Sequence, residues 1–191
     1  MTTGGTIAIV IVAIVLLILI SIIGWWISTK NTFVRYQVSI DDAASGIDVA
    51  LTKRFDLLNK MFDITKGYAK HEKETLSEVI GMRTGIPKGT TPKDLSEISS
   101  KLDQAARSIN LTVERYPELK ANTVFLELQA SSRDAEEHLQ AARRMYNSNV
   151  KVYNQKLLVF PSSIVANHYR YEKRDFFEAK AEERKDVKMK F

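Results

Sequence analysis

Hydrophobic and polar residues divide the chain into two unlike parts. The first 29 residues contain no Asp, Glu, Lys or Arg, and residues 6–27 are apolar except for Thr6, Ser21 and Gly24. A helix of about 20 apolar residues, rising about 1.5 Å per residue, crosses a hydrocarbon core about 30 Å thick. No second run of this kind follows. We therefore predict one membrane span, at about residues 6–27.

The span has the features of a retained anchor. It is longer than the core of about 7 to 15 residues that a cleaved signal peptide carries, and no Lys or Arg precedes it. Trp25 and Trp26 occur where amphipathic rings prefer the membrane interface, and Lys30 is the first charged residue after them. We predict a tail and anchor over residues 1–29, with Trp25, Trp26 and Lys30 at the interface, and a helical domain over residues 30–191.

Basic residues near the span indicate its orientation. Lys30 and Arg35 follow the span, whereas only the α-amino group precedes it. The positive-inside rule on these two charges places the C-terminal domain in the cytoplasm.

Apolar residues recur about every 3.5 positions after Lys30, which is typical of an amphipathic helix. This first helix extends without proline to about Arg83, so it either continues the membrane span or kinks at Gly46 or Gly67. Residues 84–93 hold Gly and Pro in close succession and predict a loop. The predicted stripe consists of Phe33, Tyr36, Ile40, Ala43, Ile47, Ala50, Leu57, Met61, Ile64 and Tyr68.

Two further long helices are predicted. One begins at Thr91 or Asp94 and extends to Tyr116, where Pro117 either ends it or opens the next helix. The other begins at about Asn122 and is broken after Phe160 by a Pro-Ser-Ser sequence. Their stripes are Leu95, Ile98, Leu102, Ala105, Ile109, Val113 and Tyr116, and Phe125, Leu128, Ser132, Ala135, Leu139, Ala142, Tyr146, Val150, Tyr153, Leu157 and Phe160.

The last apolar residues, between Ile164 and Phe177, predict a short helix that caps the bundle. Alternating apolar and polar runs of the strand type are missing from the sequence. The predicted fold is all-α, with an N-terminal transmembrane helix followed by an elongated antiparallel bundle of three long helices plus a shorter fourth.

Composition and motifs exclude most chemistry. The sequence has no Cys, which removes disulfides, thiolate metal sites and cysteine nucleophiles. His71-Glu72 begins like a helical zinc motif, but Thr75 stands where the second His is needed. Basic and acidic residues alternate over residues 170–190, which is typical of a solvated surface rather than of a nucleic-acid interface. We predict no catalytic, cofactor-binding or metal-binding residues, no small-molecule substrate and no nucleic-acid partner.

A series of short segments carries a family signature. Residues 67–76 read Gly-Tyr-Ala-Lys-His-Glu-Lys-Glu-Thr-Leu, and further segments agree with them in order. These are Ile47–Leu51 with Lys53–Leu57, Tyr116–Asn122 with Phe125, Tyr146–Asn154, Phe160-Pro161 and Phe176–Ala179. Together they resemble the LemA family of bacterial membrane-anchored helical proteins. The resemblance implies an elongated antiparallel bundle behind one membrane helix, with a short N-terminus outside, and it does not imply an enzymatic activity.

Some positions admit a structural or a functional interpretation. The polar run Lys70, His71, Glu72, Lys73 and Glu74 is either a solvated face or an interaction site, and solvation is favoured.

Three other positions concern packing. Asn149 either fixes the register of two helices or is exposed, and exposure is favoured. Tyr116-Pro117 and Phe160-Pro161 are interpreted as turns with an aromatic side chain packed beneath.

The sequence therefore predicts a non-catalytic, single-pass protein of the bacterial cytoplasmic membrane. Its helical domain would bind a membrane-protein partner or further copies of itself, because anchored copies meet at high local concentration. The alternative is an accessory or regulatory subunit of a membrane protease or envelope-stress system.

Overall fold

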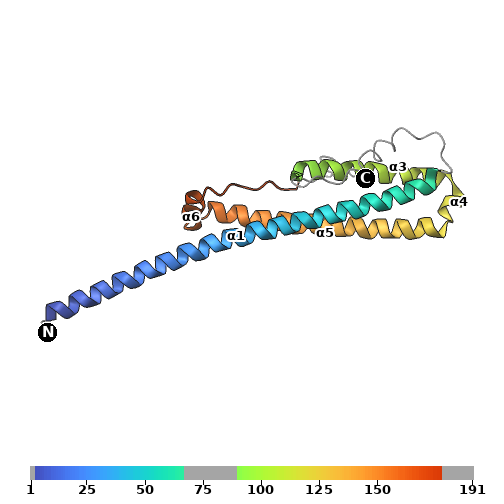
Figure 1. The fold of residues 1–191 in the computed structure, drawn as a ribbon. Helices are drawn as coiled ribbons and strands as arrows, with labels where there is room; N and C mark the ends of the chain where they lie inside the picture. Colours follow the sequence, from blue (N-terminus) through green and yellow to red (C-terminus); the bar gives the residue numbers. More distant parts are fainter. Residues whose placement is uncertain (1–2, 67–89, 178–191) are drawn as a thin grey trace, which may run out of the picture. The chain divides into compact units, whose positions relative to one another are not determined.

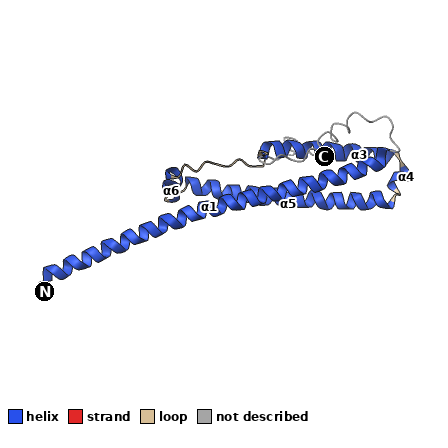
Figure 2. Ribbon diagram, viewed as in Figure 1, coloured by secondary structure: helices blue, strands red, loops and turns tan. Residues whose placement is uncertain are grey.

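The computed structural model describes residues 3–66 and 90–177, and every regular element in these ranges is an α-helix (Figures 1 and 2). The predicted all-α class, with a long apolar N-terminal helix followed by further helices, is confirmed. Because residues 67–89 lie outside the described part, the predicted number of bundle helices stays a prediction. In chain order the helices are α1 (Thr3–Lys66), α3 (Pro92–Arg115), α4 (Pro117–Lys120), α5 (Thr123–Leu158) and α6 (Ser162–His168).

The predicted span and the first amphipathic helix form one element. Helix α1 is unbroken over 64 residues and continues through Gly46. A Cβ atom at Gly46 would lie 4.0 Å from the Cβ of Ala142, an ordinary packing distance. The continuous helix is therefore the correct alternative as far as Lys66, and Gly67 lies outside the described residues.

The predicted start of the second long helix is confirmed. Thr91 caps α3: its side chain accepts a hydrogen bond from the Asp94 backbone N–H, and the Asp94 carboxylate accepts one from the Thr91 backbone N–H. This reciprocal pair satisfies two backbone donors that a helix start leaves free. Pro92 occupies the first turn, where it loses no helical hydrogen bond.

The connection between α3 and α5 is short. Helix α3 ends at Arg115, and Pro117 then opens the one-turn helix α4. Helix α5 follows at once, and the Asn122 side chain accepts a hydrogen bond of 3.1 Å from the Phe125 backbone N–H. Tyr116, between the two helices, is half-buried, which agrees with its interpretation as a packed turn residue.

Packing groups the chain into two compact units, which are described separately. Unit 1 comprises residues 1–40 and 149–174, and unit 2 comprises residues 41–148 and 175–191. This grouping does not test the predicted boundary after residue 29, which stays a prediction.

In unit 2, α5 runs antiparallel to both of its long neighbours. Toward its C-terminal end it meets the first part of α3 through Arg143 and Ser99, and nearer its start it meets the last part of α3 through Gln129 and Asn110. Helix α5 is also antiparallel to α1. Ala142 lies beside Gly46, and Glu136, which is earlier in α5, contacts Arg54, which is later in α1. Helices α1 and α3 consequently run in the same direction, and the residues that join them lie outside the described part.

One charged side chain lies in the apolar core of unit 2. Arg54 is only 5% exposed, and its guanidinium lies 2.5 Å from the Asp103 carboxylate of α3 and 2.8 Å from the Glu136 carboxylate of α5. Burial lowers the pKa of Arg54, and the nearby Glu136 carboxylate opposes that shift. Arginine keeps its charge at neutral pH, so this contact is an ionic layer that joins three helices.

In unit 1, the end of α5 packs antiparallel against α1. The Asn149 side chain donates a hydrogen bond of 2.9 Å to the Ser39 carbonyl, and the ring of Tyr153 meets that of Phe33 edge-on at 6.0 Å. The favoured interpretation of Asn149 as simply exposed is wrong, because the side chain is half-buried and bonded across the helix pair. The buried side chains of this unit are Thr29, Phe33, Ile40, Val150, Tyr153, Leu157, Ser162, Val165 and Ala166.

The predicted burial of Phe160 is wrong. Helix α5 ends at Leu158, two residues before Phe160, so the helical spacing that buries Tyr153 and Leu157 no longer applies there. Phe160 is instead 76% exposed in the turn between α5 and α6.

The predicted C-terminal cap is helical only in part. Helix α6 ends at His168, and Arg170 then adopts a left-handed conformation with φ 53°. The Tyr171 N–H donates to the Ala166 carbonyl and the Arg170 N–H to the Asn167 carbonyl, which is a Schellman ending with Arg at the position that glycine favours. Residues 171–177 are not helical, which corrects the expectation of a helix there.

Two asparagines of α5 hold this non-helical segment, one in each unit. In unit 1, the Asn154 side chain both donates to and accepts from the Arg174 backbone, at 2.8 and 3.0 Å. In unit 2, Asn147 makes the same pair of bonds with the Phe177 backbone, at 3.0 and 2.8 Å. An amide side chain paired with both groups of one backbone residue substitutes for the missing helical hydrogen bonds.

Candidate functional site at the membrane junction

Aromatic side chains gather on unit 1 where α1 leaves its apolar part. The Phe33 ring lies 5.0 Å from the Tyr171 ring, and Tyr171 lies 5.9 Å from Tyr169. The His168 ring meets Tyr169 edge-on at 4.9 Å. Aromatic pairs at these spacings contribute stability beyond the area that they bury. We call this set the juxtamembrane cluster: Trp26, Lys30, Phe33, Tyr153, His168, Tyr169 and Tyr171.

Two residues predicted at the membrane interface connect α1 to the end of α6. The Trp26 ring meets the His168 ring edge-on at 5.2 Å, and its indole N–H donates a hydrogen bond of 3.4 Å to the Tyr169 hydroxyl. The Lys30 ammonium lies 5.0 Å above the Tyr169 ring, within the range of a cation–π interaction. Trp25, the third of these residues, is half-buried and contacts Trp26 edge-on at 6.4 Å.

One tyrosine of the cluster has a shifted acidity. Burial raises the pKa of the Tyr153 phenol, while a hydrogen bond from the Gln37 amide and the charge of Arg174 oppose the shift. The phenol is neutral at physiological pH, where it accepts that amide hydrogen bond at 3.5 Å. Tyr153 therefore joins α5 to α1 through its ring and its hydroxyl.

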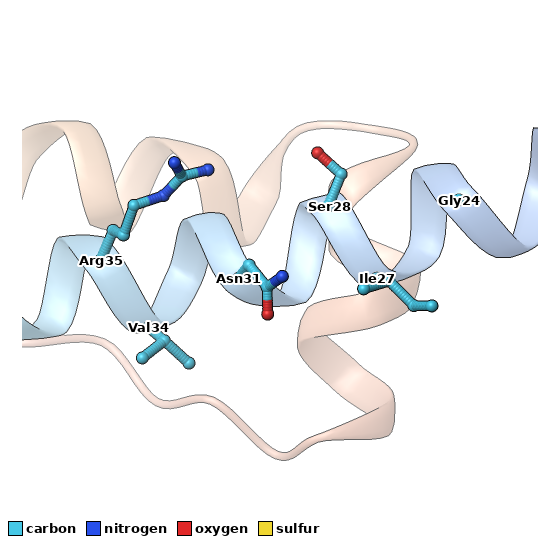
Figure 3. A pocket seen from close by; sticks show the side chains of 6 residues that line it. All are labelled: Gly24, Ile27, Ser28, Asn31, Val34 and Arg35. Atoms are coloured by element: carbon cyan, nitrogen blue, oxygen red, sulfur yellow. The ribbon is translucent and has the colours of Figure 1, made fainter.

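The face of α1 opposite to the one that packs on α5 and α6 is uncovered. A shallow open groove of about 510 Å³ runs along this face and is lined by residues of α1 alone. Figure 3 shows the Ser28 and Arg35 side chains on one side of the groove and Ile27 and Val34 on the other. A Cβ at Gly24 would meet nothing within 4 Å, so another helix could approach the backbone there. The α1 groove consists of Gly24, Ile27, Ser28, Asn31, Val34 and Arg35.

Unit 1 concentrates positive charge, which the linear sequence does not reveal. It contains seven basic residues and the single acidic residue Glu172, so its net charge is +6. The whole chain carries +5, which leaves −1 for unit 2. Of the mixed charges expected over residues 170–190, those that belong to unit 1 are three basic residues and one acidic residue, namely Arg170, Glu172, Lys173 and Arg174. The basic residues of unit 1 are Lys30, Arg35, Lys151, Lys156, Arg170, Lys173 and Arg174.

The other predicted interaction candidates cannot be placed. Lys70, His71, Glu72, Lys73 and Glu74 all lie outside the described residues. Within residues 3–66 and 90–177, no group of three or more His, Asp or Glu side chains could hold a metal ion. What the described part offers is surfaces, namely the α1 groove and the basic, aromatic junction.

Comparison with known proteins finds a matching protein family and a similar protein. The sequence profile of the LemA family matches residues 43–191. The chain is also 31% identical to "Protein LemA" of Metamycoplasma hominis over 163 residues, which is 85% of this chain and 74% of that protein. The family match begins within α1, beyond the apolar residues that precede the junction.

Proposed function

The chain belongs to the LemA family, and from this premise we propose that it is a non-catalytic, single-pass protein of the bacterial cytoplasmic membrane whose helical domain associates with further copies of itself. The observation that carries the proposal is the continuity of α1. One helix joins an exposed apolar stretch, residues 7–23, to residues that form the core of the folded domain. Such a helix anchors the domain directly, without a flexible linker.

The burial pattern of α1 supports a membrane anchor. The most apolar window of α1 has none of its residues buried, so it is not the core helix of a soluble domain. Leu17 and Ile20 are exposed by 64% and 65%, and exposed apolar surface on this scale requires a partner. A bilayer satisfies it, because residues 6–27 have the length to cross the hydrocarbon core. Retention of the anchor is supported by Trp26, which packs on α6 and would be lost by cleavage after the span.

Self-association is supported by the uncovered face of α1. Anchored copies share a plane and an orientation, which raises their local concentration and favours weak lateral contacts. The α1 groove has Gly24 and Ser28 four residues apart, the spacing that lets two membrane helices approach closely. Beyond the junction, Val34 and Val38 continue the same face and are exposed by 44% and 62%.

A non-catalytic role is supported by the family and by the groups that unit 1 offers. The LemA family is not known as a family of enzymes. Around the juxtamembrane cluster the polar side chains bond to one another or to the backbone, as in Trp26 with Tyr169 and Asn154 with Arg174. Groups arranged in this way position helices rather than activate a substrate.

Disulfide crosslinking in membranes tests self-association, because the chain has no native Cys. Asn31→Cys places a thiol in the α1 groove, and Gln155→Cys places one at an exposed position of α5. Mild oxidation is expected to yield a covalent dimer of the first variant and to leave the second monomeric. Equal crosslinking of the two variants, or none at Asn31→Cys at any expression level, would contradict the proposed contact.

The same preparation separates the alternative function. If an affinity-tagged chain recovers one foreign membrane protein in stoichiometric amount, and Asn31→Cys does not form dimers, the accessory-subunit hypothesis replaces self-association.

A further inference from the structure

The turn between α5 and α6 presents an unusual apolar surface. Leu158, Val159 and Phe160 are exposed by 65%, 57% and 76%, and Ile164 at the start of α6 is exposed by 48%. Four large apolar side chains are thus exposed within seven residues of the chain, and exposed apolar side chains gathered in this way mark an interaction surface. We call these four residues the apolar turn.

We propose that the apolar turn inserts into the interfacial region of the membrane leaflet from which α1 emerges, so that the bundle has a second point of contact with the bilayer. The proposal rests on the anchor proposed above and goes beyond it. Its occupant is the lipid of that leaflet, not a second protein.

The register of α5 on α1 sets the height of the apolar turn. Asn149 bonds to Ser39, and the two helices run antiparallel at about 1.5 Å per residue. Leu158 lies nine residues beyond Asn149, and nine residues back from Ser39 is Lys30, the first charged residue after the span. The end of α5 therefore reaches the level of the lipid headgroups, and the turn continues beyond it toward the hydrocarbon.

Helix α6 is held at the same level by direct contacts. Its last residue, His168, meets the Trp26 ring, and Tyr169 accepts the indole hydrogen bond. Trp26 is next to the last residue of the apolar span, where tryptophan prefers the boundary between hydrocarbon and water. The two helices that flank the apolar turn, α5 and α6, therefore both contact the part of α1 near this boundary.

The surrounding charge complements a lipid surface. Unit 1 has a net charge of +6, with Lys156 just before the turn and Arg170 just after α6. Basic side chains beside inserted apolar ones are the combination by which peripheral segments bind anionic headgroups. Unit 2, by contrast, has a net charge of −1.

A second copy of the chain fits the apolar turn less well. A stable protein interface buries about 800 Å² on each partner, and four side chains that are already partly covered present much less.

Lipid quenching tests the proposal on the full-length protein. Single cysteines at Phe160, at Leu126 and at Ile18 are labelled with bimane and reconstituted into vesicles of equal phosphatidylglycerol and phosphatidylcholine that contain spin-labelled lipid. Leu126 is the matched control, since it is an exposed apolar residue of α5 in unit 2. We expect the label at Phe160 to be quenched several-fold more than the label at Leu126. Circular dichroism confirms that each variant keeps its helical content.

The outcomes separate the turn from the anchor. If Ile18 is quenched and Phe160 is no more quenched than Leu126, insertion of the turn is wrong while the anchor holds. If Ile18 itself is not quenched, the anchor fails. Crosslinking between copies through Phe160→Cys without lipid quenching would overturn the proposal in favour of a protein partner. In vesicles of phosphatidylcholine alone we expect weaker quenching at Phe160, and unchanged quenching would overturn the role of charge.

Discussion

Unit 1 and unit 2 use the same two helices, α1 and α5, but different chemistry. In unit 2 the core that they share holds a buried ionic contact, Arg54 with Asp103 and Glu136, together with aliphatic and aromatic side chains. In unit 1 they meet through the rings of Phe33 and Tyr153, and this unit contains seven basic residues and one acidic residue. The difference indicates two environments. Under the function proposed above, the aromatic and basic residues of unit 1 suit a membrane interface, whereas the ionic contact of unit 2 lies within a helical core.

Replacing Arg54 should produce the largest effect, and it should fall on unit 2. Arg54→Met removes the cation that contacts both the Asp103 and the Glu136 carboxylate, and loss of one partner of a buried ion pair costs about 3–5 kcal/mol. Urea unfolding in detergent, followed by circular dichroism, measures the loss. Lys53→Met is the matched control, because Lys53 is the exposed neighbour. Equal midpoints for the two variants would show that the ionic contact does not stabilise unit 2.

The two asparagine contacts allow a direct comparison of the units. Asn147→Ala removes two partly buried hydrogen bonds to Phe177 and should cost about 2 kcal/mol, whereas Asn154→Ala removes two exposed bonds to Arg174 and should cost about 1 kcal/mol. Hydrogen exchange of the Phe177 and Arg174 amides reports each loss locally. An equal or reversed order would contradict the assignment of the more buried contact to unit 2.

A change in the backbone at the end of α6 should have a smaller effect, confined to unit 1. Arg170→Gly relieves a left-handed conformation that costs a non-glycine residue about 1 kcal/mol. The variant should therefore unfold at higher urea than Arg170→Ala, which removes the same charge but keeps the strain. Tryptophan emission is a suitable probe, because both Trp residues belong to unit 1. If the two variants unfold together, the conformation of Arg170 is not strained.

The smallest effect concerns alkaline pH. Burial raises the pKa of Tyr153 in the folded state, so its neutral form is favoured by folding. The stability it contributes is complete below the ordinary tyrosine pKa of about 10 and is lost as the pH rises through the raised value. Tyr153→Phe should therefore lose less stability than the parent protein between neutral and strongly alkaline pH, as measured by urea unfolding. Parallel pH profiles would contradict the shift.

Sequence reasoning succeeded where local chemistry decides the structure. Thr91, Pro92 and Asp94 identify the start of α3, because a capping box and an N-terminal proline act within one turn. For the first helix the stripe without proline left two alternatives open, a continuous helix or a kink at a glycine, and the structure shows a continuous helix as far as Lys66. Phe160 was misplaced because the stripe was extended past Leu158, where the helix ends and its periodicity no longer applies.

Long-range contacts escaped sequence reasoning. The predicted stripe advances by three or four residues except between Ala50 and Leu57, which are seven positions apart. The buried Arg54 occupies the position that was skipped, so the wide spacing was a signal that a charged residue lies in the core. Asn147 and Asn154 each come directly after a tyrosine, and the two Tyr-Asn pairs are seven residues apart. Their partners, 30 and 20 residues further along the chain, lie in a non-helical segment that no periodicity marks.

The sidedness and anchoring of the domain can be tested in one experiment. Gln155→Cys, at an exposed position of unit 1, and Thr2→Cys, ahead of the span, are expressed separately in bacteria and treated with a thiol reagent that does not cross the cytoplasmic membrane. A single-pass anchor with a cytoplasmic bundle predicts that Thr2→Cys reacts in cells with a permeabilised outer membrane, while Gln155→Cys reacts only after lysis. Reaction of Gln155→Cys before lysis would contradict the proposed orientation and place the bundle outside the cytoplasm.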